Sequence, residues 1–132
     1  MIIRELNHVA LHVADVASSS HFYGTALQLP LLRRPAFDFP GAWFRLGRTQ
    51  ELHLIGDRDA SVQSHPRGTH IALEVDSLDA WDAHLDALGV ARMPRRIRPD
   101  DALQTFIVDP DGHWIELCQL AGPAAPPLTS VS

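Results

Sequence analysis

The sequence predicts an α+β fold made of two tandem βαβββ modules, which form a curved mixed sheet with the helices packed outside it. The first observation is a duplication: "NHVALHVADV", from Asn7, returns as "THIALEVDSL", from Thr69, and places His70 62 residues after His8. The second is that each copy precedes the same order of helix and strand patterns. The third is size, because 132 residues suit one domain and each half is too small to bury a core alone.

The first module, residues 5–56, begins with an alternating apolar pattern over residues 6–13 that predicts a strand. Asp15 is then expected to cap a helix that carries Tyr23 and Leu27 on its inner face. Three further strands are expected over residues 29–33, 43–46 and 51–55, with a hairpin turn at residues 47–50.

The second module, residues 69–120, repeats this order. A strand over residues 70–75 leads into a helix that Asp76 or Ser77 caps and Gly89 ends. Strands are expected over residues 91–96, 104–108 and 113–119, and "DPDG" (109–112) forms the last turn. Residues 57–68 link the modules within one domain, 1–120, and the Pro/Ala-rich residues 121–132 are expected to form a flexible tail.

Composition excludes several functions. The net charge is −5 and the basic residues do not form a nucleic-acid-binding surface. Arg92, Arg95, Arg96 and Arg98 are the densest basic group; a solvated strand edge is the ordinary interpretation, and the rim of an anion-contacting pocket is the alternative. No apolar run reaches the roughly 20 residues of a membrane span, the start does not resemble a signal peptide, and a single cysteine, Cys118, permits no internal disulfide. We therefore expect a cytoplasmic protein without nucleic-acid or membrane partners.

Strand parity selects a set of side chains for the concave face of the sheet. Neighbouring side chains of a strand point to opposite faces of the sheet. In the first strand of each module, the histidine (His8 or His70) therefore lies on one face and the larger apolar residues lie on the other. The same argument places His53 and Glu116 on that face of the fourth strands. Their offset is 63 residues, and we attribute the difference from 62 to one extra residue in the turn at 109–112.

Three imidazoles and one carboxylate on a concave apolar surface suit a divalent metal such as Zn, Ni, Fe, Mn or Co. A single strand histidine is ordinarily a core or surface residue, but four matched positions favour ligands. Four more residues are expected in the substrate pocket or supporting the ligands: His12, Glu74, Trp114 and Cys118. His12 and Glu74 are repeat equivalents and can form an ion pair, Cys118 can be an inert core thiol, and the remaining histidines, including His113, are expected at the surface.

The stretches "NHVALHV", "THIALEV" and "DPDGHWIEL" resemble the marker strands of the vicinal oxygen chelate (VOC) superfamily over residues 5–120. That group includes glyoxalase I, methylmalonyl-CoA epimerase, extradiol dioxygenases, fosfomycin-resistance thiol transferases and bleomycin-binding proteins. The resemblance implies a glyoxalase-like cup with metal ligands at His8, His53, His70 and Glu116. The position of His53 is typically glutamate in glyoxalase I and glutamine in the epimerase, and it is no ligand in the thiol transferases and dioxygenases, so whether His53 is a ligand stays open.

The resemblance implies a metal-dependent lyase or isomerase, similar to lactoylglutathione lyase, that acts on a small oxygen-chelating substrate through enolate-type stabilisation. Glu116 would be ligand and base, and a thiol cofactor such as glutathione can take part. The alternatives are a single-domain extradiol dioxygenase and a metal-free small-molecule binding or resistance protein; fosfomycin transfer is disfavoured because the Pro/Ala tail replaces an arginine-containing segment. A homodimer is expected, with His8 and His53 of one chain joining His70 and Glu116 of the other, or else each site lies within one chain.

Overall fold

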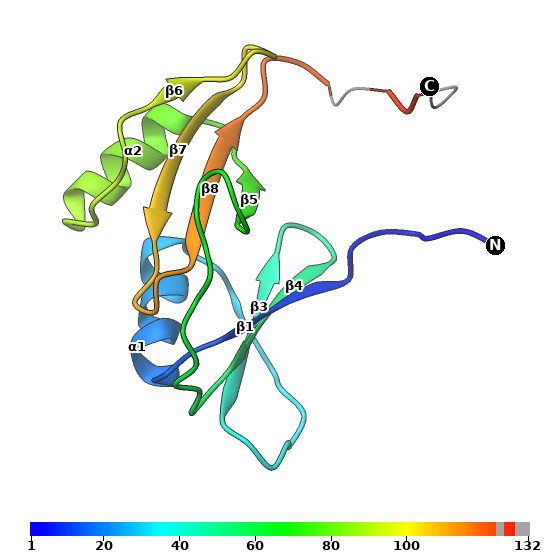
Figure 1. Ribbon diagram of the computed structural model, residues 1–132, viewed down its shortest axis with the longest axis vertical. Helices are drawn as coiled ribbons and strands as arrows, with labels where there is room; N and C mark the ends of the chain where they lie inside the picture. Colours follow the sequence, from blue (N-terminus) through cyan, green and yellow to red (C-terminus); the bar gives the residue numbers. More distant parts are fainter. Residues whose placement is uncertain (124–125, 129–132) are drawn as a thin grey trace.

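The computed structural model describes residues 1–123 and 126–128 and confirms two successive βαβββ modules (Figure 1). In the first module, the elements are β1 (His8–His12), α1 (Val16–His21), the π-helical η1 (Phe22–Ala26), β2 (Leu31–Leu32), β3 (Gly41–Leu46) and β4 (Gln50–Ile55). In the second module they are β5 (Ile71–Glu74), α2 (Leu78–Ala87), β6 (Arg96–Ile97), β7 (Leu103–Val108) and β8 (Trp114–Gln119).

Each module forms its own four-stranded mixed sheet. The strand orders are β1-β4-β3-β2 and β5-β8-β7-β6, with β1 parallel to β4 and β5 parallel to β8. Strands β1 and β5 therefore pair on one side only and form one edge of each sheet, and the short β2 and β6 form the other. His8 lies on the first of these edge strands and His70 immediately precedes the second.

The helices begin and end where the local chemistry requires. A side-chain oxygen of Asp15, Oδ2, accepts a hydrogen bond from the backbone N–H of Ser18 at 3.0 Å and caps α1. Of the two residues expected to cap α2, Ser77 does so by accepting from the N–H of Ala80 at 3.3 Å. Gly89, with φ of +71°, ends α2 because a left-handed backbone favours glycine.

The strand register corrects the position of the extra residue. Trp43 pairs with His53 and Phe106 pairs with Glu116, so both hairpins join residues ten apart and their turns have equal length. The turn at 109–112 therefore contains no insertion. Because the residues that cap α1 and α2 are still 62 apart, the additional residue lies after the α2 cap and before β7.

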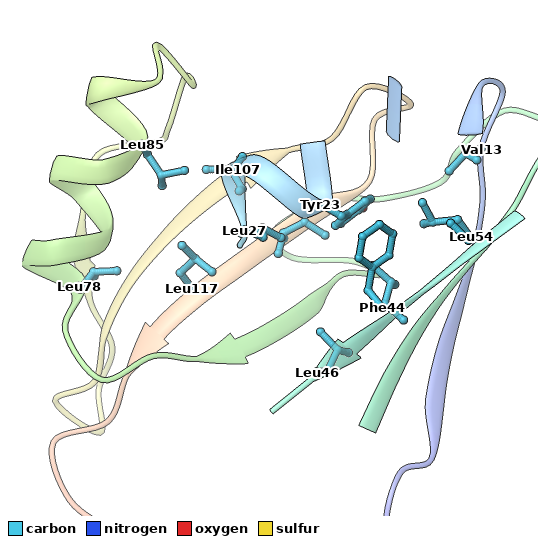
Figure 2. Packing of buried hydrophobic residues seen from close by; sticks show 14 residues of the cluster. Val13, Tyr23, Leu27, Phe44, Leu46, Leu54, Leu78, Leu85, Ile107 and Leu117 are labelled. Atoms are coloured by element: carbon cyan, nitrogen blue, oxygen red, sulfur yellow. The ribbon is translucent and has the colours of Figure 1, made fainter. Parts of the chain in front are cut away.

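One continuous core joins the two modules. Figure 2 shows Tyr23 and Leu27, from η1 and its end, between Phe44 and Leu54 of the first sheet and Leu117 of the second. All five side chains are 3 % exposed or less. The modules are therefore packed as a single unit, as the small size of each half requires.

A group of polar contacts lies beside this core, where the β7–β8 turn meets the first helical segment (Figure 1). We call it the joint between the modules, and it consists of Asp109 and Asp111 of the turn with Ala14, Ser19 and Tyr23. The Tyr23 hydroxyl donates to Asp109 Oδ2 at 2.7 Å. Asp111 accepts from the backbone N–H of Ala14 at 2.9 Å and from the Ser19 hydroxyl at 3.2 Å. Burial, followed by the nearby Asp109 carboxylate, raises the pKa of Tyr23 well above its ordinary value.

The segment expected as a strand over residues 91–96 is mostly irregular, and Arg96 is its one residue that belongs to a strand, β6, which pairs with β7. The reason is that Arg92 and Arg95 turn toward α2, where they bind Asp86 and Asp82. In the expected tail, residues 121–123 and 126–128 lie outside helices and strands, while residues 124–125 and 129–132 lie outside the described residues. No helix of the described part of the chain has the length and apolar character needed to cross a membrane.

Candidate functional site

The four predicted ligands form two separate pairs in the chain. His8 lies against His53, which we call the first pair, and His70 faces Glu116, which we call the second pair. Within residues 1–123 and 126–128, no group of three or more His, Cys, Asp or Glu side chains is placed to hold a metal ion. A complete four-residue site is therefore not assembled by this chain alone.

The two pairs occupy equivalent places in the two sheets. Ala10 pairs with His53 in the first sheet, and Ala72 pairs with Glu116 in the second. The neighbours of His53 on β4, Leu52 and Leu54, are in the core, as are the neighbours of Glu116 on β8. His53 and Glu116 therefore point away from the core, as strand parity predicts.

In the second pair, His70 Nε2 lies 3.5 Å from Glu116 Oε2. His70 Nδ1 donates to the backbone carbonyl oxygen of His65 at 3.3 Å, and this fixes the hydrogen on Nδ1 because a carbonyl can only accept. In the neutral imidazole, the lone pair of Nε2 then faces a carboxylate oxygen at a distance too long for a good hydrogen bond. Two electron-rich atoms facing each other in this way suit a bound cation, so the donor set fits a divalent metal.

Glu116 is well supported although it is only 4 % exposed. Gln104 Nε2, from the adjacent strand β7, donates a short hydrogen bond to Oε1. Arg98 Nη1 lies 3.6 Å from the same oxygen. These donors offset the cost of burying a carboxylate and leave Oε2 directed at His70.

In the first pair, His8 has the same arrangement of ring nitrogens as His70. Its Nδ1 donates to Asn7 Oδ1 at 2.8 Å, which leaves Nε2 with a free lone pair. A histidine held through Nδ1 by an oxygen acceptor is typical of metal ligands, because the second contact fixes the ring and raises its basicity. His8 and His70 are thus held in the same way in the two modules.

His53 is held differently. Its ring lies between Trp43, with centroids 3.9 Å apart, and His8, with centroids 4.2 Å apart. Its Nε2 is 2.9 Å from Glu51 Oε1, so Nε2 donates and Nδ1 is the nitrogen with the lone pair. Two nearly parallel rings do not direct their lone pairs at one point, and His53 as a fourth ligand stays a prediction.

His12 and Glu74 do not form the expected ion pair. The His12 carbonyl oxygen instead accepts from His113 Nε2 at 2.8 Å, and the two rings meet edge to face at 5.4 Å. His113 is 8 % exposed, so the expectation of a surface histidine is wrong. The β7–β8 turn places His113 in the joint between the modules. The residues next to His113 in the sequence give no sign of this burial.

The other pocket candidates line the edges of the second pair. Trp114 is half-buried on the same face of β8 as Glu116, and its ring meets Phe106 at 6.0 Å. Cys118 is buried, and this burial, followed by the nearby Glu116 carboxylate, raises the pKa of its thiol. A raised thiol pKa lowers reactivity, so Cys118 has the character of an inert core thiol.

Comparisons with known proteins place the chain in a family. The profile described as "Glyoxalase/Bleomycin resistance protein/Dioxygenase superfamily" matches residues 5–117. The chain is 28 % identical to "Glyoxylase I 4" of Arabidopsis thaliana, over 88 % of this chain and 71 % of that protein. It is 30 % identical to the lactoylglutathione lyase of Salmonella typhimurium, over 86 % of this chain and 91 % of that protein.

A second kind of relative and a solved structure are also similar to the chain. The "Metallothiol transferase FosB" of Bacillus licheniformis is 28 % identical, over 85 % of this chain and 73 % of that protein. Among solved structures, a putative glyoxalase family protein from Bacillus anthracis superimposes with a TM-score of 0.79 at 22 % identity, over 91 % of this chain and 98 % of that chain, and shares the fold. With its two βαβββ modules and its match over residues 5–117, the chain belongs to the glyoxalase/bleomycin resistance protein/dioxygenase superfamily.

Proposed function

We propose that this chain is a metal-dependent, glyoxalase-like lyase or isomerase that acts on a small substrate with two neighbouring oxygen atoms. The observation that carries the proposal is that His8 and His70 are each held through Nδ1 with Nε2 free, and that Nε2 of His70 faces the buried carboxylate of Glu116. Relatives named glyoxylase I and lactoylglutathione lyase support this choice of reaction. A thiol such as glutathione would serve as a cofactor.

The ligands would be His8, His70 and Glu116, with His53 as the predicted fourth. The donor types suit Zn, Ni, Fe, Mn or Co, and the bound ion would act as a Lewis acid toward the substrate oxygens. Glu116 would take up the proton from the carbon next to the substrate carbonyl. Gln104 holds this carboxylate in place through Oε1, and Trp114 and Phe106 provide an apolar wall beside it.

The complete site is proposed to form between two copies of the chain. Three features support this: the two pairs are separate within one chain, each module forms a separate sheet, and β1 and β5 each leave an unpaired edge. Bringing the β1 edge of one copy to the β5 edge of the other would cover both edges and join the first pair of one chain to the second pair of its partner.

Mixing two inactive variants tests this arrangement. One variant carries His8→Ala and His53→Ala, and the other carries His70→Ala and Glu116→Gln. If sites are shared, the mixed dimers regain one complete site each, and random exchange restores roughly one quarter of the wild-type metal stoichiometry. If each site lies within one chain, every chain in the mixture is defective and no metal binding returns.

Glu116→Gln tests the proposed base. The amide keeps an oxygen donor, so the variant is expected to retain part of the bound metal while losing formation of lactoylglutathione from methylglyoxal and glutathione. Turnover equal to that of the wild type would overturn the role of Glu116 as base. Failure of the wild-type protein to take up any of the five metals would overturn the proposed function itself.

The alternatives make different predictions. The named relatives are glyoxalases and a metallothiol transferase, and they do not favour a ring-cleaving dioxygenase. A metal-free binding protein would keep its ligand affinity after treatment with a chelator. The proposed enzyme would lose activity under the same treatment and regain it when the metal is restored.

A further inference from the structure

The four arginines between α2 and β7 have different roles. Arg92 Nε donates to Asp86 Oδ1 at 2.8 Å, and Arg95 Nη2 donates to Asp82 Oδ2 at 2.6 Å, so both are bound to α2. Arg96 lies exposed on β6. Arg98 alone reaches the second pair, where it approaches Glu116.

Arg98 is fixed by a tight local structure. Its Nε and Nη2 donate to the two carboxylate oxygens of Asp100 at 3.0 and 2.5 Å. Its backbone N–H donates to the carbonyl oxygen of Ala102 at 2.8 Å, and its own carbonyl accepts from the N–H of Asp101 at 2.9 Å. A two-point contact of this kind sets the plane of the guanidinium group and therefore the direction of its third nitrogen, Nη1.

Within the described residues, that third nitrogen contributes only a long ionic contact and retains its capacity to donate hydrogen bonds. Nη1 lies 3.6 Å from Glu116 Oε1, which is too long for a hydrogen bond, and Oε1 already accepts from Gln104. In the described part of the chain no hydrogen bond engages Nη1, and the side chain is 31 % exposed. A rigid cationic donor is thus presented at the margin of the second pair.

We propose that Arg98 binds a carboxylate that lies a few bonds from the chelating oxygens of the substrate. The inference rests on the proposed function and names the substrate class, a small carboxylic acid with vicinal oxygens. Charge supports it: Arg98, Asp100 and Glu116 together carry −1, a divalent ion would make the group +1, and a monoanionic substrate would neutralise it. Arginine is suited to this role because its planar N–H groups match a carboxylate.

Two hydroxamates with the same number of carbon atoms provide the test. Butyrohydroxamate and succinate monohydroxamate both chelate a metal through two neighbouring oxygens, but only the second ends in a carboxylate. Their dissociation constants are measured by calorimetry on the protein loaded with Zn²⁺ or Ni²⁺. The variants are Arg98→Gln and Arg98→Lys, with Arg96→Gln as the matched control of equal charge change.

The wild-type protein is expected to bind succinate monohydroxamate at least about tenfold more tightly, a difference typical of a charge-assisted contact. The ratio should fall to about one in Arg98→Gln, recover in part in Arg98→Lys and stay unchanged in Arg96→Gln. A parallel titration with S-methylglutathione identifies the source of the carboxylate: affinity for it that depends on Arg98, without a hydroxamate ratio, would move the contact to the cofactor and overturn the substrate class.

Equal binding of both hydroxamates by the wild-type protein would overturn the role of Arg98 while leaving the metal site intact. This result needs no variant and so does not depend on whether Arg98→Gln folds. A ratio that persists in Arg98→Gln would also overturn it. Binding of neither compound to metal-loaded protein would instead remove the proposed function, and the inference about Arg98 with it.

Discussion

Removal of the Tyr23 hydroxyl provides a direct test of the joint between the modules. The Tyr23 side chain is fully buried and its hydroxyl donates to Asp109 Oδ2 at 2.7 Å. The other oxygen, Oδ1, already accepts from the backbone N–H groups of Asp111 and His113. Tyr23→Phe keeps the ring and removes the hydrogen bond to Oδ2, so the expected loss is about 1.5–3 kcal/mol, as for a hydrogen bond to a charged group.

The free energy of unfolding is measured by urea denaturation of wild type and variant under the same conditions. Thr25→Val is the matched control, because it removes an exposed hydroxyl from the same helical segment and is expected to change stability by less than about 0.5 kcal/mol. Equal stability of Tyr23→Phe and wild type would refute the argument that this contact holds the turn of the second module against η1. A loss as large for Thr25→Val would show that helix propensity, and not the joint, is responsible.

Three further predictions concern stability. Because the pKa of Tyr23, the single tyrosine, is raised in the fold, its phenol should stay neutral in the native protein above pH 10. The free energy of unfolding should fall as the pH rises past that value, because the phenol of the unfolded chain ionises there. Tyrosinate absorbance that appears before unfolding would contradict this. Ser77→Ala removes the cap of α2 and should cost about 1 kcal/mol in thermal or urea unfolding, and an unchanged free energy of unfolding would show that water replaces the cap. Gly89→Ala should lower the free energy of unfolding by about 1 kcal/mol because φ is +71° there, even though no atom would contact the added methyl group. An unchanged midpoint of urea unfolding would show that the turn can relax.

The module order is readable from the sequence because its signals are local. Alternation, helix caps and turn residues identify each element, and the duplication of His8 at His70 shows that the elements repeat. Two features are not local. The closure of each module into its own sheet depends on which strand edges meet in three dimensions, and the position of the extra residue shows only in the pairing of β7 with β8. Both are set by contacts between distant residues.

The same distinction applies to the site. Parity is a property of single strands, so it correctly assigns His53 and Glu116 to one face of their sheets. It says nothing about what lies beside them, and Gln104 and Arg98 reach Glu116 from β7 and from a turn. Glu51 carried a usable signal, because it is two residues before His53 and therefore on the same face of β4. Arg98 carried only the general signal of the basic group, because its direction depends on the Asp100 contact.

Metal affinity of single variants tests whether His53 is a ligand or a support for His8. His8 is held by Asn7 with Nε2 free, whereas His53 uses Nε2 to contact Glu51 and packs between Trp43 and His8. We therefore expect His8→Ala to weaken metal binding more than His53→Ala does. Removal of the support in Asn7→Ala should weaken it by roughly tenfold or more, as is typical when a group that holds a metal-bound histidine is lost.

Competition with a chromogenic chelator gives all three affinities on one scale. If His53→Ala costs as much as His8→Ala, the ring of His53 must turn away from Glu51 when the ion binds, and it is a fourth ligand. In that case Glu51→Gln, which weakens the competing contact, should strengthen metal binding. If Glu51→Gln instead weakens binding together with His53→Ala, the two residues act as a support, since both would then work by holding the His8 ring in place.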